Sequence, residues 1–311
     1  MGIKMKTVDV KSERKRRWVK GLFAILLMLA GVCLLAYPWL SNWLYDHQTY
    51  SEYNVYSAEV EDLEAEERAA ILEEAQAYNS IVWERQVTMT NPFHIPTLME
   101  LGDEIYLDIL SVGDSGVMGY LEIPAISVSL PIYHGTEDET LSAGVGHMEG
   151  SSLPVGGEST HAVLTGHSGL TGKKLFTDLT ELEEGDYFYI RILGEILAYR
   201  VATVQTVLPT EMDTLRIQDG KDLVTLMTCT PYGVNSHRLL VTGERVEYDE
   251  AAYEALEGEK TTAISSQWLR DYRNAALTAV ALLLVLLIFS GILKVPKKVK
   301  GNTRKNRHPD I

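Results

Sequence analysis

The chain has 311 residues, of which 46% are hydrophobic and 23% are charged. This composition excludes a wholly disordered, collagen-like or coiled-coil protein. The formal net charge of −15 argues against a nucleic-acid partner, because phosphate contacts require clustered lysine and arginine. The two cysteines, Cys33 and Cys229, are too few for a disulfide-rich scaffold or a four-cysteine zinc site.

The charges are distributed unevenly along the chain. Residues 1–20 and 294–311 each carry a net charge of +6, whereas residues 41–273 contain 13 basic and 40 acidic side chains, a net charge of −27. Each basic end adjoins an uncharged apolar run, residues 21–40 and 274–293. Because about 20 apolar residues span the hydrocarbon core of a bilayer, both runs are predicted to be transmembrane helices.

The basic ends also predict the topology. Lysine and arginine accumulate on the cytoplasmic side of a membrane, so both termini are expected inside the cell and residues 41–273 outside it. A cleaved signal peptide is the alternative for the first apolar run. It is less favoured, because the bulky Tyr37, Trp39 and Leu40 follow the apolar core where a cleavage site needs small residues.

The outer region begins with a helical pattern and continues with strands. Residues 57–82 have apolar side chains at helical spacing among acidic ones, which predicts an amphipathic helix. Residues 84–110 contain Pro92 and Pro96 and are expected to be irregular. From Met118 the chain has short runs rich in β-branched and aromatic residues, separated by Gly, Pro, Asp or Asn. Seven or eight such strands predict a closed or sandwich-like β-domain.

Cys229 is the one cysteine expected outside the membrane, since Cys33 lies within the first apolar run. It ends the strand-like run LVTLMTC, and a second strand begins near Arg238 after a turn. The two residues are therefore expected at adjacent strand ends. A guanidinium beside a thiol favours the thiolate and can hold a developing oxyanion. On the local pattern alone, an inert buried thiol and a surface arginine remain the alternative.

A cysteine nucleophile needs a general base and acid, which is most often histidine. Among the histidines of the outer region, His167 directly follows the apolar run HAVLTG and is flanked by glycine. A side chain at such a strand exit can reach a cleft. His147, His161 and His167 have no recognised zinc-ligand spacing, so neither a metal nor another cofactor is expected.

Four segments resemble a known family. TLMTCTPYGVNSHRLL at 225–240 resembles the TLxTC…R signature of sortases, specifically of the pilus-assembling class C enzymes. HAVLTGHSGLTGKKLFTDL at 161–179 resembles the sortase histidine region, and GYLEIPAISVSLPIYHGT at 119–136 resembles the first strands of the barrel. GVGHMEGSSLPVGGEST at 144–160 matches the class C pattern. The blocks follow in the right order over residues 80–250, which is more specific than a lone TxTC.

The resemblance implies a mainly β fold: a closed, sortase-type eight-stranded β-barrel with an N-terminal helix and a lid loop, flanked by two transmembrane helices. It implies that Cys229 is the nucleophile that forms an acyl-thioester and that His167 is the general acid and base. It also implies that Arg238 stabilises the oxyanion or the substrate carbonyl.

Class C sortases carry an Asp-Pro-aromatic loop that covers the cysteine. In this chain Asn91, Pro92 and Phe93 occupy the expected place between the helix and the barrel. Asn91 departs from the usual Asp. A carboxylate would form an ion pair with Arg238, whereas a neutral amide can only form a hydrogen bond with it.

The resemblance further implies a cysteine transpeptidase of a Gram-positive cell membrane. Such an enzyme cleaves LPxTG-like sorting signals between Thr and Gly and transfers the acyl group to a pilin lysine. Its partners would be LPxTG-type pilins or surface proteins and the membrane. Three alternatives remain open: a housekeeping sortase that anchors proteins to peptidoglycan, a non-catalytic membrane-anchored adhesin or sensor ectodomain, and a hydrolytic cysteine protease.

The expected organisation has seven segments. They are a basic cytoplasmic tail (1–20), a transmembrane helix (21–40), an extracellular helical segment with the lid loop (41–110), the catalytic barrel (111–249), a juxtamembrane spacer (250–273), a second transmembrane helix (274–293) and a second basic tail (294–311).

Overall fold

The computed structural model describes residues 10–85, 103–113, 115–170, 173–259, 273–282 and 285. The chain divides into two units, Met1–Trp268 and Leu269–Ile311, which are described separately. In the second unit, residues 273–282 and 285 are helical. The beginning of the predicted second span, 274–293, is therefore a helix, and the rest of that span lies outside the described residues.

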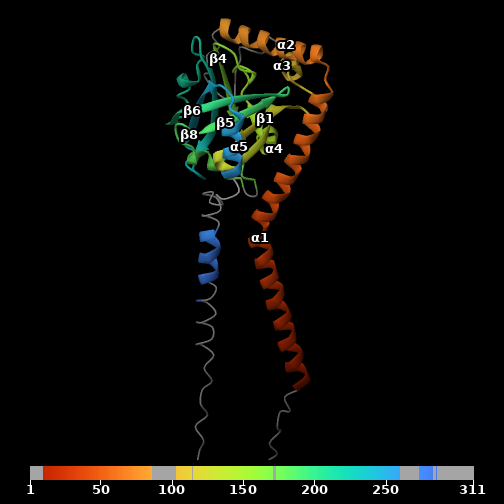
Figure 1. The fold of residues 1–311 in the computed structure, drawn as a ribbon. Coiled ribbons are helices and arrows are strands. Elements are labelled where there is room, and N and C mark those ends of the chain that lie inside the picture. Colours follow the sequence, from red (N-terminus) through yellow and green to blue (C-terminus); the bar gives the residue numbers. More distant parts are fainter. Residues whose placement is uncertain are drawn as a thin grey trace, which may run out of the picture. The chain divides into compact units, whose positions relative to one another are not determined.

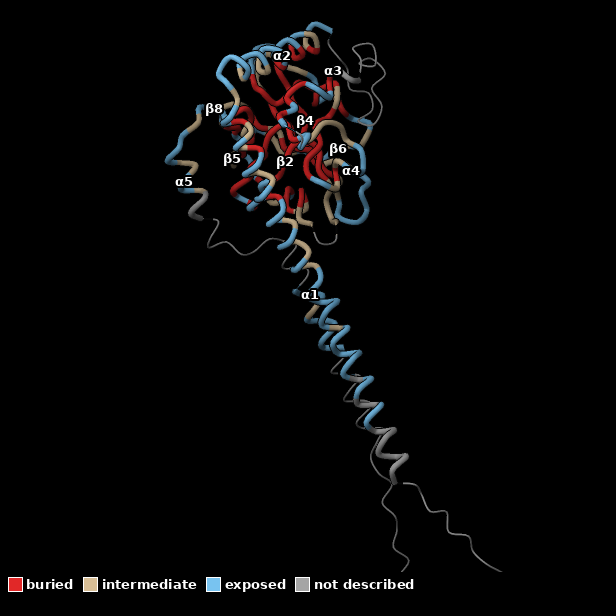
Figure 2. The backbone as a smooth tube through the Cα atoms, turned by 90° about the vertical axis from the view of Figure 1, so that its right-hand side faces the viewer, coloured by how far each residue is buried: buried red, intermediate tan, exposed pale blue. Residues whose placement is uncertain are grey.

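The first unit begins with the long helix α1, Val10–Asp62, which contains the first apolar run and Pro38. The apolar side chains of this run face solvent, as for Phe23 and Leu34, which are 63% and 76% exposed. Figure 2 shows this exposed stretch leading away from the buried barrel. Among the described residues, one helix is long and apolar enough to cross a membrane, Ile25–Asp62.

The helix expected over residues 57–82 is in fact two helices. Helix α1 continues without interruption to Asp62, and a separate helix α2, Ala65–Glu84, begins after Glu64. The backbone of Glu64 is extended, with φ −64° and ψ 150°, so the chain turns there instead of continuing the helical path. The turn lays α2 across one end of the barrel, above α3 (Figure 1).

Eight strands in the described part of the chain form a closed barrel in the order β1-β2-β3-β4-β7-β8-β6-β5. This confirms the predicted eight-stranded fold. The strands are β1 Val117–Ile123, β2 Val128–His134, β3 Val145–His147, β4 Thr160–Thr165, β5 Tyr187–Ile192, β6 Glu195–Val207, β7 Asp222–Thr230 and β8 His237–Val246. Short helices lie between and after them: α3 Asp103–Asp108, α4 Asp138–Ala143, α5 Glu250–Glu259, and the 3₁₀ turns η1 Pro124–Ile126, η2 Thr177–Glu181 and η3 Asp213–Leu215.

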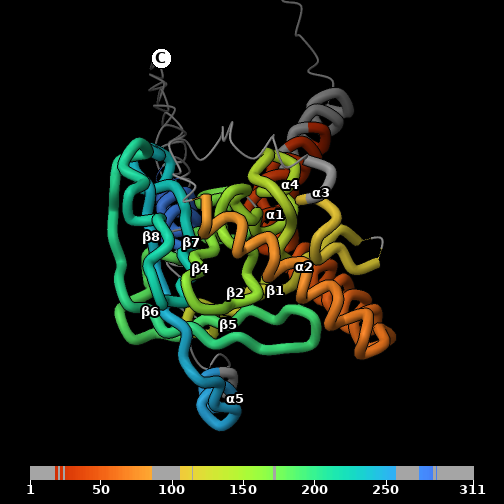
Figure 3. The backbone as a smooth tube through the Cα atoms, turned by 90° about the horizontal axis from the view of Figure 1, so that it is seen from above, coloured from red at the N-terminus to blue at the C-terminus, as the bar shows by residue number. Residues whose placement is uncertain are grey.

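Most neighbouring strands are antiparallel, but β2 pairs with β3 and β4 pairs with β7 in parallel. The parallel β4–β7 pair matters for function, because both strands then end on the same side of the barrel. Figure 3 shows β4, β7 and β8 next to one another. The barrel is filled by large side chains with no solvent exposure, including Tyr120, Phe188 and Tyr199.

Buried polar contacts fasten the helices to the barrel. The Tyr56 hydroxyl of α1 donates to the Met118 carbonyl (3.0 Å) and accepts from the Leu193 backbone N–H (3.2 Å). The Asn79 side chain of α2 bonds both the N–H (2.7 Å) and the carbonyl (3.1 Å) of Leu153. Since unpaired buried polar groups are costly, these contacts fix where α1 and α2 lie on the barrel.

Candidate active site

Cys229 lies one residue before the end of β7, as a free and half-buried thiol. Directly opposite it in the antiparallel pairing with β8 is Arg238, the second residue of that strand. Directly opposed residues on an antiparallel pair have side chains on the same face of the sheet. The strand ends predicted from the sequence therefore place the thiol and the guanidinium on one face.

His167 reaches the same end of the barrel from the other side of β7. Strand β4 runs parallel to β7, and its last residue, Thr165, pairs with Met227. His167 follows two residues later, where β7 reaches Cys229. Its side chain is half-buried, as are those of Cys229 and Arg238. The three residues predicted from the sequence are thus carried by three adjacent strands to one end of the barrel.

Small residues allow the His167 loop to lie this close. A side chain at Gly166 would place its Cβ 2.7 Å from the ring of Phe176, which is fully buried. Phe176 in turn donates its backbone N–H to the His167 carbonyl (3.0 Å). Gly169 has φ +80°, and a Cβ there would lie 2.9 Å from the Tyr232 ring. The loop of residues 166–169, called the histidine loop below, therefore packs between Phe176 and Tyr232.

The guanidinium of Arg238 is held by the loop that precedes it. Its Nη1 donates to the carbonyls of Asn235 (3.3 Å) and His237 (3.1 Å). The described side chains of Cys229, His167 and Arg238 form no hydrogen bond with one another. Catalytic hydrogen bonds are often long in the absence of substrate. The strand pairing brings a thiol, an imidazole and a guanidinium to one end of the barrel.

Two other histidines of the barrel are structural. His147 is completely buried, where its Nδ1 accepts from the Tyr106 hydroxyl (2.9 Å) and its Nε2 donates to the Ser152 carbonyl (2.9 Å). Burial lowers the pKa of His147 to about 3, so the ring is neutral at ordinary pH. His161 is also buried, and burial lowers its pKa.

Both ring nitrogens of His161 are occupied as well, by the Arg216 carbonyl (3.1 Å) and the Thr225 hydroxyl (2.7 Å). Neither histidine has a nitrogen free for a metal ion. Within the described residues, no group of three His, Cys, Asp or Glu side chains is placed to hold one.

The predicted lid residues Asn91, Pro92 and Phe93 lie outside the described residues. Sequence reasoning missed a different feature of the site: the Ser168 hydroxyl, which donates to the Cys229 carbonyl (2.7 Å). Thr228 and Tyr232, which also contact the histidine loop, were missed too. The only available signal was the position of these residues next to the predicted catalytic ones.

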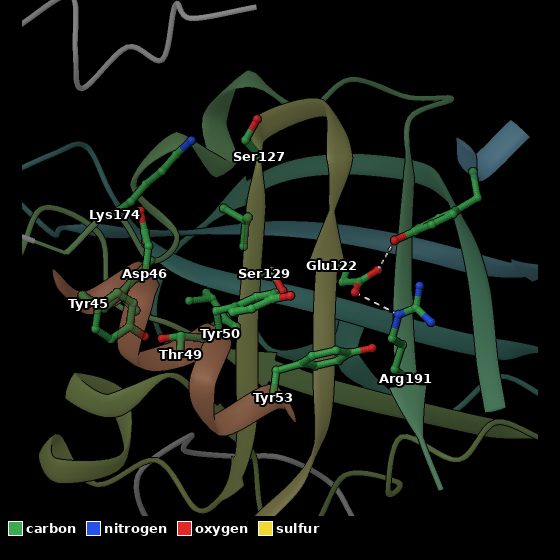
Figure 4. Close-up of a pocket in the computed structure, with 14 residues that line it drawn as sticks. Tyr45, Asp46, Thr49, Tyr50, Tyr53, Glu122, Ser127, Ser129, Lys174 and Arg191 are labelled. Carbon is green, nitrogen blue, oxygen red and sulfur yellow. Dashed lines mark hydrogen bonds and ion pairs between the residues drawn. The ribbon is translucent and has the colours of Figure 1, made fainter. Parts of the chain in front are cut away.

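A separate cavity of about 420 Å³ lies between α1, the β1–β2 hairpin and α5 (Figure 4). Tyr45 and Tyr53 line it from α1, and Glu122 binds Arg191 and Tyr253 at its edge. None of the three predicted catalytic residues is among the described residues that line it. This cavity is therefore not part of the arrangement around Cys229.

A closed barrel that presents a free thiol, an imidazole and a guanidinium at adjacent strand ends suits a cysteine-dependent acyl-transfer enzyme. Comparison with known proteins identifies the family. A sortase domain matches residues 121–246. Sortase C-1 from Actinomyces oris is 48% identical, with a TM-score of 0.53 over 58% of this chain and 99% of that structure.

A sortase C structure from Streptococcus pneumoniae is 37% identical, with a TM-score of 0.56 over 64% of this chain and 97% of that structure. Sortase A of Streptococcus agalactiae serotype III is 25% identical over 248 residues, which are 76% of this chain and 91% of that protein. The chain belongs to the sortase family, as a class C sortase, and is a cysteine transpeptidase. The resemblance inferred from the four sequence segments is confirmed.

Proposed function

We propose that this sortase cleaves LPxTG-like sorting signals between Thr and Gly and joins the new acyl end to a lysine of a pilin subunit. Cys229 is the nucleophile, His167 is the general acid and base, and Arg238 stabilises the oxyanion. The observation that carries these assignments is the convergence of β4, β7 and β8, with Cys229 opposite Arg238 and the histidine loop beside Cys229.

The reaction proceeds in two halves. The Cys229 sulfur attacks the Thr carbonyl carbon, and Arg238 donates hydrogen bonds to the oxygen that becomes negative. The C–N bond then breaks, His167 protonates the departing Gly amine, and the acyl group remains on Cys229 as a thioester. In the second half a lysine amine attacks the thioester, His167 accepts its proton, and the Cys229 thiolate leaves. The product is an isopeptide bond between two subunits.

Pilus assembly is favoured over peptidoglycan anchoring by the relatives. The Streptococcus pneumoniae sortase C is described with a pilin substrate specificity, and the class C structures share 37% to 48% identity with this chain. The matching sortase A proteins share 25% to 32%. The acyl-enzyme half is common to both functions, so the difference lies in which amine resolves the thioester.

The proposed location is the cell membrane of a Gram-positive-type bacterium. One pass lies in α1 at residues 21–40 and a second at residues 274–293, so that the catalytic domain is extracellular and both basic tails are cytoplasmic. The exposed apolar side chains of α1 support the first pass. Holding the enzyme and its membrane-tethered substrates in one plane raises their effective concentration.

The decisive experiment mixes the full-length enzyme with an LPxTG peptide and a purified pilin. Mass spectrometry of the enzyme should find the peptide attached to Cys229, and electrophoresis should show SDS-resistant pilin ladders. Cys229→Ala should abolish both products. Cys33→Ala is the matched control, because it removes the other cysteine without touching the barrel, and it should behave like the wild type.

Each alternative function gives a different product. An adhesin or sensor ectodomain forms no thioester, and a hydrolytic protease releases the peptide acid at the same rate with or without an amine. A housekeeping sortase forms the thioester but transfers the peptide to a peptidoglycan-type amine and not to pilin. Transpeptidation by the Cys229→Ala protein would refute the assignment of the nucleophile.

A further inference from the structure

The backbone ladder between β4 and β7 stops shortly before Cys229. In a strand, the carbonyls of alternate residues point to the same neighbouring strand. The carbonyls of Met227 and Cys229 therefore both face β4. The Met227 carbonyl accepts the backbone N–H of Gly166 at 3.1 Å. The next hydrogen bond of the ladder would be made by the Cys229 carbonyl. Because β4 has already ended at Thr165, this carbonyl needs a different partner.

The hydroxyl of Ser168 supplies that partner. It donates to the Cys229 carbonyl at 2.7 Å, in a partly buried position. In a parallel ladder, the backbone N–H two residues after Gly166 would occupy this rung. Here the chain turns away instead, and the backbone N–H of the next residue, Gly169, donates to the Thr177 hydroxyl (3.0 Å). The hydrogen bond from the Ser168 side chain thus replaces the backbone hydrogen bond that would have continued the β4–β7 ladder.

His167 consequently lies between two ties to the nucleophile's strand. On one side, the backbone N–H of Gly166 donates to the Met227 carbonyl. The carbonyl of Gly166 also accepts from the Thr228 hydroxyl, at 2.7 Å. On the other side Ser168 bonds Cys229 itself. We propose that Ser168 is a positioning residue for acyl transfer: its hydroxyl holds the backbone of the proposed base at a fixed place relative to the backbone of the proposed nucleophile. This inference rests on the proposed roles of Cys229 and His167.

The consequence of losing this tie is specific. Proton transfer requires the base to lie within hydrogen-bond reach of the reacting group, and a displacement of 1 Å can lower a rate by about 100-fold. The Thr228 bond and the packing of Gly169 on Tyr232 remain when the hydroxyl is removed. The loop is therefore expected to stay folded but to hold His167 less accurately.

The test compares Ser168→Ala with Ser168→Thr in the full-length enzyme, using an LPxTG peptide and an amine acceptor. Ser168→Ala should lower kcat about 10-fold, leave KM within about twofold and shift the pH profile of kcat. Ser168→Thr retains a hydroxyl and should restore most of the rate. Ser80→Ala is the matched control, since the Ser80 hydroxyl also donates to a backbone carbonyl, that of Gln76 (3.0 Å), but lies on α2. It should change nothing.

The outcomes separate this inference from the proposed function. If Ser168→Ala keeps the wild-type kcat and pH profile while Cys229→Ala is inactive, the positioning role is wrong and the proposed function stands. If Ser168→Ala and Ser168→Thr lose the same rate together with thermal stability, the residue is only structural, and the inference is again overturned. If Cys229→Ala remains active, the proposed function itself fails.

Discussion

Cys229 on β7 and Arg238 on β8 are directly opposite each other in the antiparallel pairing of these strands. The distance between such residues is set by the sheet, because cross-strand neighbours have Cβ atoms about 4.5–5.5 Å apart. The guanidinium is further held by the carbonyls of Asn235 and His237. The sheet therefore places Arg238 and Cys229 on one face, and the two carbonyls hold the guanidinium at this end of β8 before any substrate binds.

Replacing Arg238 by lysine tests whether the shape of the guanidinium matters as well as its charge. Lysine keeps the charge but loses the rigid planar fork of donors, so it cannot reach the loop carbonyls and an oxyanion in the geometry that the guanidinium allows. We expect Arg238→Lys to lower kcat/KM for peptide acylation by about 10- to 100-fold. Arg200→Lys, at an exposed position on β6, should have no effect. Equal activity of the two variants would contradict the assignment of Arg238.

The contact between Gly169 and Tyr232 can be tested with a second glycine as reference. Gly169 and Gly233 have φ +80° and +72°, so alanine is strained by about 1–2 kcal/mol at either position. At Gly169 the new Cβ meets a ring at 2.9 Å, whereas no described residue lies within 4 Å of a Cβ built at Gly233. Gly169→Ala should therefore lower the acylation rate about 10-fold more than Gly233→Ala.

Removing the ring should relieve the clash. Tyr232 is 66% exposed, so Tyr232→Ala is expected to leave the protein folded. The double variant with Gly169→Ala and Tyr232→Ala should therefore be as active as Tyr232→Ala alone. A double-mutant cycle of acylation rates measures this. Purely additive losses would show that the ring does not press on the histidine loop.

The strands and the Cys229–Arg238 pair were predictable because they depend on short-range patterns, whereas the closure of the strands into a barrel was implied by the family resemblance. Alternating apolar residues mark strands, and a thiol and an arginine at the two ends of one turn must lie near each other. The position of His167 beside them required the family resemblance, since nothing local in HAVLTG indicates that β4 pairs with β7 in parallel. The bond from Ser168 to Cys229 depends on that same register and was not predictable.

The break between α1 and α2, in contrast, could not be predicted from a short-range pattern. The apolar spacing over residues 57–82 correctly indicated helix, but the break after Asp62 has no strong breaker, since residues 63 and 64 are Leu and Glu. The break follows from where α1 and α2 find partners on the barrel, through Tyr56 and Asn79. Pro38 within α1 would by itself suggest an end, yet the helix continues through it.

The proposed lid gives a labelling prediction. If Phe93 covers the thiol, Phe93→Ala should raise the rate at which iodoacetamide alkylates Cys229 by about threefold or more, because an aromatic contact that shields the sulfur is lost. The assay uses a Cys33→Ala background so that only Cys229 reacts. Leu98→Ala, from the same proline-containing segment of the sequence, is the control. Unchanged labelling in the Phe93 variant would mean that the segment is not a cover.

Glu122 links the barrel to α5 and gives a prediction about stability. This carboxylate is 7% exposed and accepts from Arg191 Nε and from the Tyr253 hydroxyl, each at 2.8 Å. Glu122→Gln leaves Arg191 without its counter-ion, so it should lower the free energy of unfolding by about 2 kcal/mol. Tyr253→Phe removes one hydrogen bond and should cost about 1 kcal/mol. Urea unfolding measures both, and a Glu122 variant as stable as the wild type would contradict this account.

The buried His147 predicts how stability depends on acid. Its folded-state pKa of about 3 lies below the unfolded value of about 6.5. Between these two pH values the unfolded chain binds a proton that the folded protein does not. Stability is therefore complete above about pH 6.5 and falls as the pH decreases, by about 1.4 kcal/mol per pH unit for this histidine. Burial also lowers the pKa of His161 and His134, which act in the same direction.

Two variants separate the titration of His147 from its hydrogen bonds. His147→Gln removes the titrating ring, so urea unfolding between about pH 6 and pH 4.5 should show a slope smaller by about 1.4 kcal/mol per pH unit. Tyr106→Phe removes the hydroxyl that bonds Nδ1 and should cost about 1 kcal/mol at every pH while keeping most of the slope. A wild-type slope in His147→Gln would show that other groups cause the acid sensitivity. Peptide acylation at pH 7.5 should persist in both variants, since neither residue belongs to the proposed catalytic set.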